Sequence, residues 1–127
     1  MSSSEERYQR GWDLLQRIDG SAGRAVIAAL GDVAPDLARY VIEFPFGDIY
    51  HRPGLDLRSR EIATVAALAA LGTAAPQLKV HLHGALNVGC TREELVELLI
   101  QIAVNAGFPA ALNAMLVARE VFAERPA

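Results

Sequence analysis

The sequence has little of what several classes of protein require. It contains one cysteine, Cys90, so an intrachain disulfide, a CxxC redox pair and a thiolate zinc cluster are excluded. Its 12 Lys and Arg residues are interspersed with 15 Asp and Glu residues, which gives a net charge of −3 and leaves no basic run. Because a nucleic-acid-binding surface needs clustered positive charge to meet the phosphates, we do not expect nucleic-acid binding.

Long apolar segments are also missing. The longest apolar run, at 62–72, is too short to span a bilayer, so we expect a buried helix there and no membrane partner. The first residues, MSSSEERYQRGW, are polar and charged, unlike a signal peptide. The single cysteine is compatible with a reducing compartment. These features together predict a cytoplasmic protein.

Aromatic residues are scarce, at 6%, although 52% of the chain is hydrophobic. Much of the apolar content is Ala, Leu and Val, which favours close-packed helices over a β-sandwich. No strand-like alternation of period two is sustained anywhere. At 127 residues the chain is long enough for one domain with its own core. We therefore predict a single all-α domain, 1–127, with six to seven helices.

Caps and helix breakers give the helix boundaries. Ser3 with Glu6, and Thr91 with Glu94, have the spacing of capping boxes, and prolines suit the first turns of the last helices. The expected helices cover 4–20, 22–30 (stopping at Gly31), about 33–44, 57–71, 76–88, 92–106 and 109–124. The segment 45–56 is rich in Gly and Pro and is expected to be largely loop or broken turns.

In the third of these helices, four residues are expected to form one apolar face: Leu37, Tyr40, Val41 and Phe44.

Two of the three histidines lie in the run 80-VHLHGALNVG-89. The helical neighbours of His81 include Leu78 and Ala85, so His81 faces a core or a pocket. His83 has Lys79 and Asn87 four residues to either side and lies on a polar stripe. Because the two rings face away from each other, they cannot both bind one metal ion in the manner of HExxH, and no metal site is predicted.

Glu61 is the second polar residue on an apolar face. Its helical neighbours are Leu57, Val65 and Leu68, so its carboxylate needs a partner or a proton. One interpretation is a structural ion pair with Arg58 or Arg60, just as His81 alone could be a hydrogen-bonded core histidine. The alternative is that Glu61 and His81, from consecutive helices, meet and form an acid–base site.

Other polar residues are weaker candidates. Arg52, Arg58 and Arg60 cluster around the junction of loop and helix, where they could bind a carboxylate or simply be surface charge. His83 alone is expected to be a solvated or interface residue. Cys90 follows a helix stop with no predicted base beside it and is expected to be a small packing residue.

The chain resembles the carboxymuconolactone decarboxylase family, within the AhpD-like all-α superfamily. The resemblance is carried by FGDIYHRPGLDLRSREIATVAALAALG and by LKVHLHGALNVGCTREELVELLIQIAVNAGFPAALNA, which together span about residues 46–114. It implies an AhpD-like helical bundle that assembles into homo-oligomers, trimers or hexamers. It also implies cofactor-free decarboxylation of 4-carboxymuconolactone to the 3-oxoadipate enol-lactone in protocatechuate breakdown, or a reaction of a closely related lactone.

The resemblance places His81 at the family's histidine and Glu61 close to its glutamate, so these two would be catalytic. From the needs of the reaction we expect Arg58 or Arg60 to bind the substrate carboxylate, with His83 and Asn87 as secondary polar contacts. The peroxidase-type relatives carry Glu…CxxCxxxH, and this chain has Ala74 and Gln77 where the two cysteines would be, so disulfide-based peroxide reduction is not expected. Asn105 stands where the decarboxylases usually have tyrosine. This difference concerns which substrate the protein accepts.

Two rival functions stay open at this stage. The same pocket could act on another lactone or keto acid, or the protein could be a catalytically idle oligomer that binds a ligand.

Overall fold

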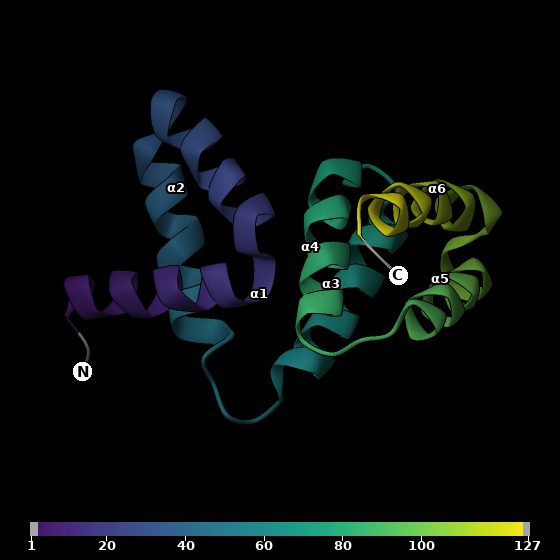
Figure 1. Ribbon diagram of the computed structural model, residues 1–127, viewed down its shortest axis with the longest axis horizontal. Helices are drawn as coiled ribbons and strands as arrows, with labels where there is room; N and C mark the ends of the chain where they lie inside the picture. The colour runs from purple at the N-terminus through teal and green to yellow at the C-terminus, as the bar shows by residue number, and fades with distance from the viewer. Residues whose placement is uncertain (1–2, 126–127) are drawn as a thin grey trace. The chain divides into compact units, whose positions relative to one another are not determined.

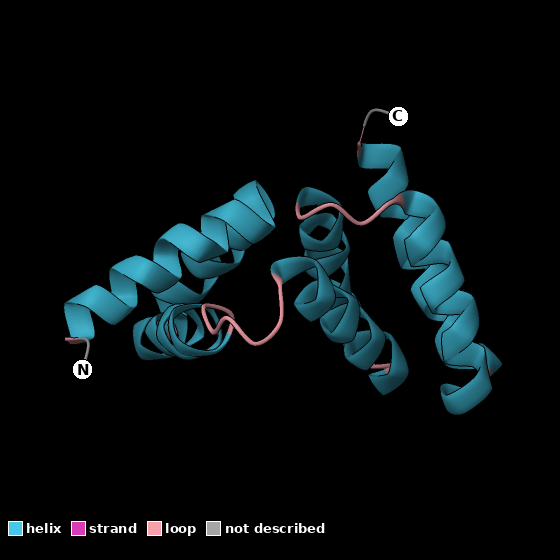
Figure 2. Cartoon of the chain, turned by 90° about the horizontal axis from the view of Figure 1, so that it is seen from below, coloured by secondary structure: helices cyan, strands magenta, loops and turns pink. Residues whose placement is uncertain are grey.

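The computed structural model describes residues 3–125, which form six α-helices and one π-helix with no strand between them (Figures 1 and 2). The helices are α1 (Ser4–Val33), α2 (Pro35–Val41), η1 (Ile42–Ile49), α3 (Leu57–Leu71), α4 (Ala75–Asn87), α5 (Arg92–Ala106) and α6 (Phe108–Glu124). The predicted all-α class is confirmed. Within the described range, every helix is too short or too polar to cross a membrane.

The chain divides into two compact units, with the boundary between Leu57 and Arg58. The first unit contains α1, α2 and η1, and the second contains α3 to α6. Each unit is described below by itself. The single domain, the AhpD-like bundle and the oligomer stay predictions.

Helix boundaries in the second unit agree with the sequence expectations. Thr91 and Glu94 form a reciprocal capping box at the start of α5, which satisfies two backbone N–H groups that the helix itself cannot use. Pro76 and Pro109 lie in the first turns of α4 and α6, where a missing N–H costs nothing. Gly89 and Gly107 follow α4 and α5 with φ of 107° and 92°, a region that favours glycine.

Helix boundaries in the first unit agree less well. The expected break at Gly20 is present, because its φ of 58° and ψ of −136° are not helical, although α1 continues on both sides of it. The expected stop at Gly31 is wrong, since α1 runs on to Val33. The helix ends ahead of Pro35, whose ring disfavours helical geometry at Ala34.

The loop expected at 45–56 is wrong at its start, because residues up to Ile49 belong to η1. Pro45 has no N–H to donate, and the Tyr50 N–H reaches back five residues to the Pro45 carbonyl at 2.7 Å. A proline inside a helix removes one α-helical hydrogen bond, and a π turn restores backbone pairing with a wider ring.

The apolar face expected for the third helix is also wrong. Leu37, Tyr40 and Phe44 are each half or more exposed, whereas Ala38, Ile42 and Phe46 are buried. The buried residues Ala38 and Ile42 each lie one residue after an expected position, so the face is displaced already in α2. The π-helix that begins at Ile42 then changes the direction of the later side chains, including Phe44.

α1 and η1 pack through their backbones. A Cβ atom at Gly11 would lie 2.0 Å from the Ile42 carbonyl oxygen, and one at Gly47 would lie 2.7 Å from the Arg7 carbonyl oxygen. Arg7 also forms a two-pronged ion pair with Asp48, at 2.7 and 3.1 Å. The two glycines therefore set how closely these helices approach.

We expect Gly11→Ala to destabilise the protein by about 1–3 kcal/mol, because a methyl group cannot fit against a fixed carbonyl. Gly31→Ala is the matched control, since nothing lies within 4 Å of the added Cβ and the φ is not positive. That substitution should be neutral or stabilising by about 0.4–1 kcal/mol. Urea unfolding followed by circular dichroism measures both, and equal effects would contradict the proposed close packing.

The core of the second unit is built mainly from aliphatic side chains of all four helices. Val65, Leu82, Leu95, Leu99 and Val121 are fully buried, and Ala85 and Ala118 pack among them. The small alanines let the helices approach closely. Cys90 belongs to the same buried cluster, which agrees with the packing role predicted for it.

Candidate active site

Glu61 and His81 lie in contact within the second unit. The Nδ1 atom of His81 is 3.0 Å from Oε2 and 3.2 Å from Oε1 of Glu61. Glu61 is fully buried, and the His81 side chain is 17% exposed. The structure thus brings together the two residues that stood out in the sequence as polar groups on apolar faces.

The helices position both residues through their apolar faces. On α3, Val65 and Ala69 follow Glu61 at intervals of four residues and are buried like it. On α4, Leu78 and Ala85 lie three residues before and four residues after His81, and both are buried. Glu61 and His81 therefore lie on the apolar faces of α3 and α4, as predicted. The buried residues beside them on these helices belong to one core cluster.

The contact constrains the chemistry of His81. A buried carboxylate accepts hydrogen bonds, so the Nδ1–H of the imidazole donates to it. This bond fixes the ring orientation and the tautomer, and it stabilises the imidazolium form when Nε2 also carries a proton. A histidine held this way can move a proton at Nε2, which is the function required of a general acid or base.

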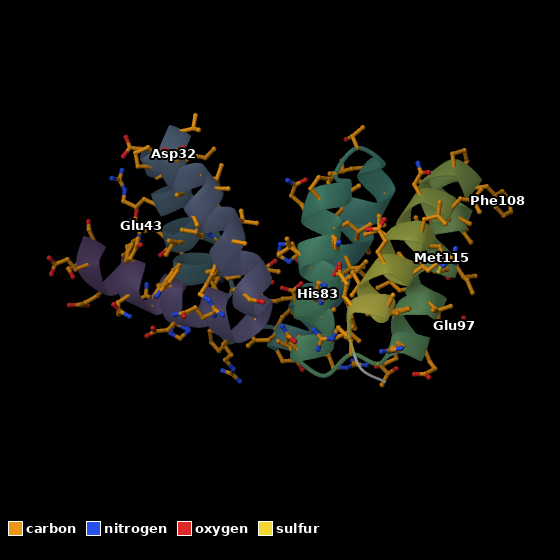
Figure 3. The ribbon with its side chains drawn as sticks, turned by 45° about the horizontal axis from the view of Figure 1, so that its top comes forward. Asp32, Glu43, His83, Glu97, Phe108 and Met115 are labelled. Carbon is orange, nitrogen blue, oxygen red and sulfur yellow. The ribbon has the colours of Figure 1, made fainter. Side chains whose placement is uncertain are left out.

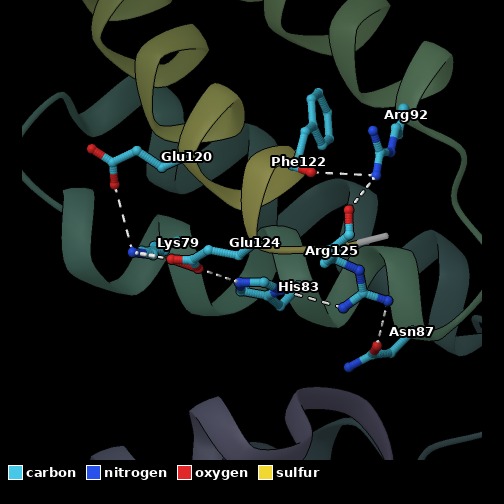
Figure 4. Close-up of polar contacts among 8 residues, drawn as sticks. All are labelled: Lys79, His83, Asn87, Arg92, Glu120, Phe122, Glu124 and Arg125. Carbon is cyan, nitrogen blue, oxygen red and sulfur yellow. Dashed lines mark hydrogen bonds and ion pairs between the residues drawn. The ribbon is translucent and has the colours of Figure 1, made fainter. Parts of the chain in front are cut away.

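His83 points to a different set of partners (Figure 4). Its Nε2 lies 3.2 Å from Glu124 Oε2, and Arg125 Nη1 donates to its Nδ1 at 3.2 Å. Arg125 Nη2 also donates to Asn87 Oδ1 at 2.9 Å. The two histidines therefore face different partners, as predicted. The His83 side chain is only 16% exposed, because the end of α6 covers it, so the solvated alternative is wrong and the interface alternative stays a prediction.

Lys79 extends the same polar stripe of α4 to the end of α6. Its Nζ is 2.7 Å from Glu124 Oε1 and 3.6 Å from Glu120 Oε2. Arg92, at the start of α5, donates to the backbone carbonyls of Phe122 and Arg125, where the dipole of α6 favours a cation. The sequence interpretation missed these α6 partners. Glu120 and Glu124, four residues apart, match the spacing of Lys79 and His83 and were the available signal.

Arg58 forms an ion pair with Glu94 and not with Glu61. Glu94 is also the partner of Thr91 in the capping box at the start of α5. The side chains of Arg58 and Glu94 are both more than a third exposed, so this pair contributes little to stability. Arg60 is half-buried on α3. Arg58 therefore pairs with a residue at the surface, and Glu61 pairs with His81. Substrate contacts by Arg58 or Arg60 stay predictions.

A hollow of about 680 Å³ opens between α3 and α5, but it does not include the Glu61–His81 pair. Arg58 and Ile62 line it together with Glu93, Glu94 and Glu97. Three carboxylates against one paired arginine repel an anionic ligand. This hollow is therefore a poor place for a carboxylated substrate.

The pKa of Glu124 is lowered, first by its hydrogen bond to Lys79 and then by that to His83, and the pKa of Lys79 is raised by the same contact. A lowered carboxyl pKa stabilises the folded state above the ordinary value of about 4.3, and the stabilisation is lost as pH falls below it. The Lys79 contribution is present at pH 7 and is lost only in strong alkali.

We therefore expect the last turn of α6 to lose hydrogen-exchange protection as pH falls below about 4.3 and through the lowered pKa of Glu124, since its carboxylate then takes up a proton. Glu124→Gln should remove most of this pH dependence by lowering protection already at pH 5. Glu97→Gln is the control, because Glu97 lies on the exposed side of α5. A wild-type profile unchanged down to pH 3 would contradict the role of this ion pair.

Comparison with known proteins agrees with the resemblance. The chain matches the sequence model of the Carboxymuconolactone decarboxylase family over residues 35–120. It is 34% identical over 121 residues to the 4-carboxymuconolactone decarboxylase of Acinetobacter baylyi, which is 94% of this chain and 90% of that protein. It is 28% identical, over the same shares, to an uncharacterized 15.0 kDa protein in the nqo9–nqo10 intergenic region of Paracoccus denitrificans.

A further relative is the nitrosuccinic acid decarboxylase npaB of Metarhizium robertsii, 33% identical over 81 residues, or 63% of this chain and 55% of that protein. Two of these three relatives are thus named as decarboxylases of different small acids. The family match covers most of the chain, and it includes α3 to α5 and therefore both Glu61 and His81. The chain belongs to the carboxymuconolactone decarboxylase family.

Proposed function

We propose that this protein decarboxylates a small carboxylated lactone without a cofactor, with 4-carboxymuconolactone as the first substrate to test and the 3-oxoadipate enol-lactone as its product. The reaction would belong to the protocatechuate branch of aromatic catabolism. Family membership and the decarboxylase relative at 34% identity support the reaction class. The observation that carries the proposal is the buried contact between Glu61 and His81, which has the geometry that a proton-transfer pair requires.

Loss of carbon dioxide leaves an electron pair on the substrate carbon. In an unsaturated lactone, this pair is delocalised as a dienolate onto the ring carbonyl oxygen. The carbon then takes one proton, so that carboxylate plus proton gives the new C–H bond and carbon dioxide. His81 would supply this proton from Nε2, or stabilise the oxyanion by donating a hydrogen bond, and would regain its proton from water.

Glu61 would act through His81. Its two oxygens accept from Nδ1–H, so it holds the ring in one orientation and favours the imidazolium from which the proton is delivered. Val65, Leu78 and Ala85 are buried on the helix faces that carry the pair, and the water that they exclude would favour the loss of charge from the departing carboxylate.

Arg58 and Arg60 remain the proposed contacts for a spectator carboxylate, since α3 presents both within one turn of Glu61. Arg58 would have to exchange Glu94 for the substrate. His83 and Asn87 are proposed as secondary contacts, but they could bind a substrate only if their bonds to Glu124 and Arg125 opened. We therefore rank the arginines above them.

A second candidate substrate class is favoured by the nitrosuccinic acid decarboxylase relative. A nitro group, like a conjugated lactone, accepts the electron pair that carbon dioxide leaves behind. The same histidine could then serve an aliphatic nitro acid. Asn105, which stands where the decarboxylases usually have tyrosine, is exposed. Its effect on the choice between these two substrates stays a prediction.

The test is the direct release of carbon dioxide from purified protein offered 4-carboxymuconolactone, with no metal or cofactor added. Nitrosuccinate and a lactone lacking the second carboxylate are offered in parallel. Release from the lactone at a rate well above the buffer supports the first proposal, and release from nitrosuccinate alone would replace it with the second. No release from any of them would contradict the proposed reaction class.

A further inference from the structure

The C-terminal end of α6 is held against α4 through both nitrogens of one histidine ring. Figure 3 labels His83 on α4, and Figure 4 shows its ring between Glu124 and Arg125. Nε2 lies 3.2 Å from Glu124 Oε2, and Nδ1 lies 3.2 Å from Arg125 Nη1. One ring nitrogen therefore faces an anion and the other faces a cation.

These two partners fix the tautomer of His83. A guanidinium has only N–H donors, so Nδ1 must accept from Arg125 and carries no proton. The pKa of Glu124 is lowered, first by its hydrogen bond to Lys79, so at pH 7 its carboxylate is ionised and accepts from Nε2–H. His83 is thus a neutral ring with its proton on Nε2, whereas His81 carries a proton on Nδ1.

A second proton on the His83 ring reverses one contact and keeps the other. The proton can add only at Nδ1, where the lone pair accepts from Arg125. The new N–H would face a guanidinium N–H, and two positive charges would lie about 3 Å apart, which is repulsive. The bond from Nε2–H to Glu124 would become stronger, because its donor is then charged.

We propose that His83 is a pH switch, which holds the Arg125 side chain on α4 while Nδ1 is unprotonated and releases it when the ring becomes charged. Histidine is the side chain whose charge ordinarily changes between about pH 5 and pH 8. The Arg125 contact is therefore present at the alkaline end of this range and is lost as pH falls. This inference is independent of the proposed decarboxylation.

The other charged groups around the ring limit what the switch moves. Lys79, one turn before His83 on α4, pairs with Glu120 and Glu124 of α6. Arg92, at the start of α5, donates to the main-chain carbonyl of Arg125 at 2.8 Å. These bonds do not involve Nδ1 of His83. The last turn of α6 and the main chain after it therefore stay in place, and only the guanidinium leaves.

Release of the guanidinium also changes the surface of α4. Arg125 Nη2 donates to Asn87 Oδ1 at 2.9 Å, so the guanidinium bridges two α4 residues that are four apart, His83 and Asn87. Repulsion at His83 weakens this second bond, because both bonds belong to one rigid, planar group. The released state exposes a charged N–H donor on α4 that the guanidinium otherwise covers.

The tautomer is the first measurement. At about pH 8, two-bond ¹H–¹⁵N correlations of the imidazole rings should show the proton of His83 on Nε2 and that of His81 on Nδ1. The variants His81→Asn and His83→Asn each remove one set of signals and so assign them. A proton on Nδ1 of His83 at this pH would overturn the proposal, since Arg125 could not then donate to it.

The release of Arg125 is measured by the rotation of its guanidinium about the Nε–Cζ bond, which exchanges Nη1 with Nη2. Rotation must break the bonds to both His83 and Asn87. Arg119, exposed on the same helix, is the internal reference. By NMR, Arg125 should rotate at least about ten times more slowly than Arg119 at about pH 8, and equally fast at about pH 5. Equal rates at pH 8, or slow rotation at pH 5 with His83 protonated, would contradict the proposed switch.

His83→Asn is the matched variant. Its Oδ1 takes the place of Nδ1 as acceptor but gains no proton in this range, so Arg125 should rotate slowly at both pH values. If the variant also releases Arg125 at pH 5, another group is responsible and the assignment to His83 is overturned. Amide protection in the last turn of α6 should be equal at the two pH values in the wild type, and its loss at pH 5 would place the change in the helix instead. If the variant does not fold, the wild-type tautomer and rotation rates decide the proposal by themselves.

Discussion

Replacing His81 with asparagine is expected to lower kcat for carbon dioxide release by a factor of about 10² to 10⁴, the usual contribution of a positioned general acid. The asparagine amide can take the place of Nδ1–H and donate to Glu61, so the buried carboxylate keeps a partner. It has no group at the position of Nε2 and cannot deliver a proton. The measurement is kcat on 4-carboxymuconolactone, with the folded state checked by circular dichroism.

Glu61→Gln should lower kcat by a smaller but still large factor, about 10² or more, because the amide no longer favours the imidazolium. It should also move the alkaline limb of the pH–rate profile to lower pH, because the general acid then loses its proton more readily, which a purely structural role would not do. His51→Asn is the matched control, since it changes the same residue type at an exposed position outside the proposed site. Near-wild-type kcat in both the His81 and the Glu61 variants would remove the proposed proton-transfer pair.

The second large effect concerns stability. His81→Leu should destabilise the protein by about 3 kcal/mol, because it leaves the carboxylate of Glu61 buried without the imidazole that faces it. His81→Asn should cost much less, since it preserves a donor. Denaturant unfolding at pH 7 measures both values.

The double variant Glu61→Leu with His81→Leu separates the interaction from the cost of burial. It should be more stable than His81→Leu alone, since two apolar side chains replace a buried charge and its partner. A double-mutant cycle gives the coupling between the two positions. Equal losses in the leucine and asparagine variants at His81 would indicate that packing, not the hydrogen bond to Glu61, determines its contribution.

The sequence predicted the second unit well because its boundaries depend on local chemistry. A capping box at Thr91, glycines with positive φ and prolines in first turns each act within a few residues. The first unit was predicted less well because η1 depends on a π turn around Pro45 and on backbone packing against Gly11. Neither leaves a periodic pattern of apolar residues.

The candidate site was also predicted only in part. Glu61 and His81 stood out because a polar group on an apolar helix face requires a partner. The contacts of His83 with Glu124 and Arg125 were not predicted, because the matching spacing of Glu120 and Glu124 does not by itself show that the end of α6 covers α4.

The packing of Gly11 against Ile42 has a consequence for how this sequence can vary. The atoms that meet there belong to the main chain of both helices, so trimming neighbouring side chains creates no space for a larger residue. Compensating second-site changes, which rescue many overpacked cores, have no target at this position. Random mutagenesis followed by selection for folded protein should therefore recover glycine at position 11 and no suppressor elsewhere.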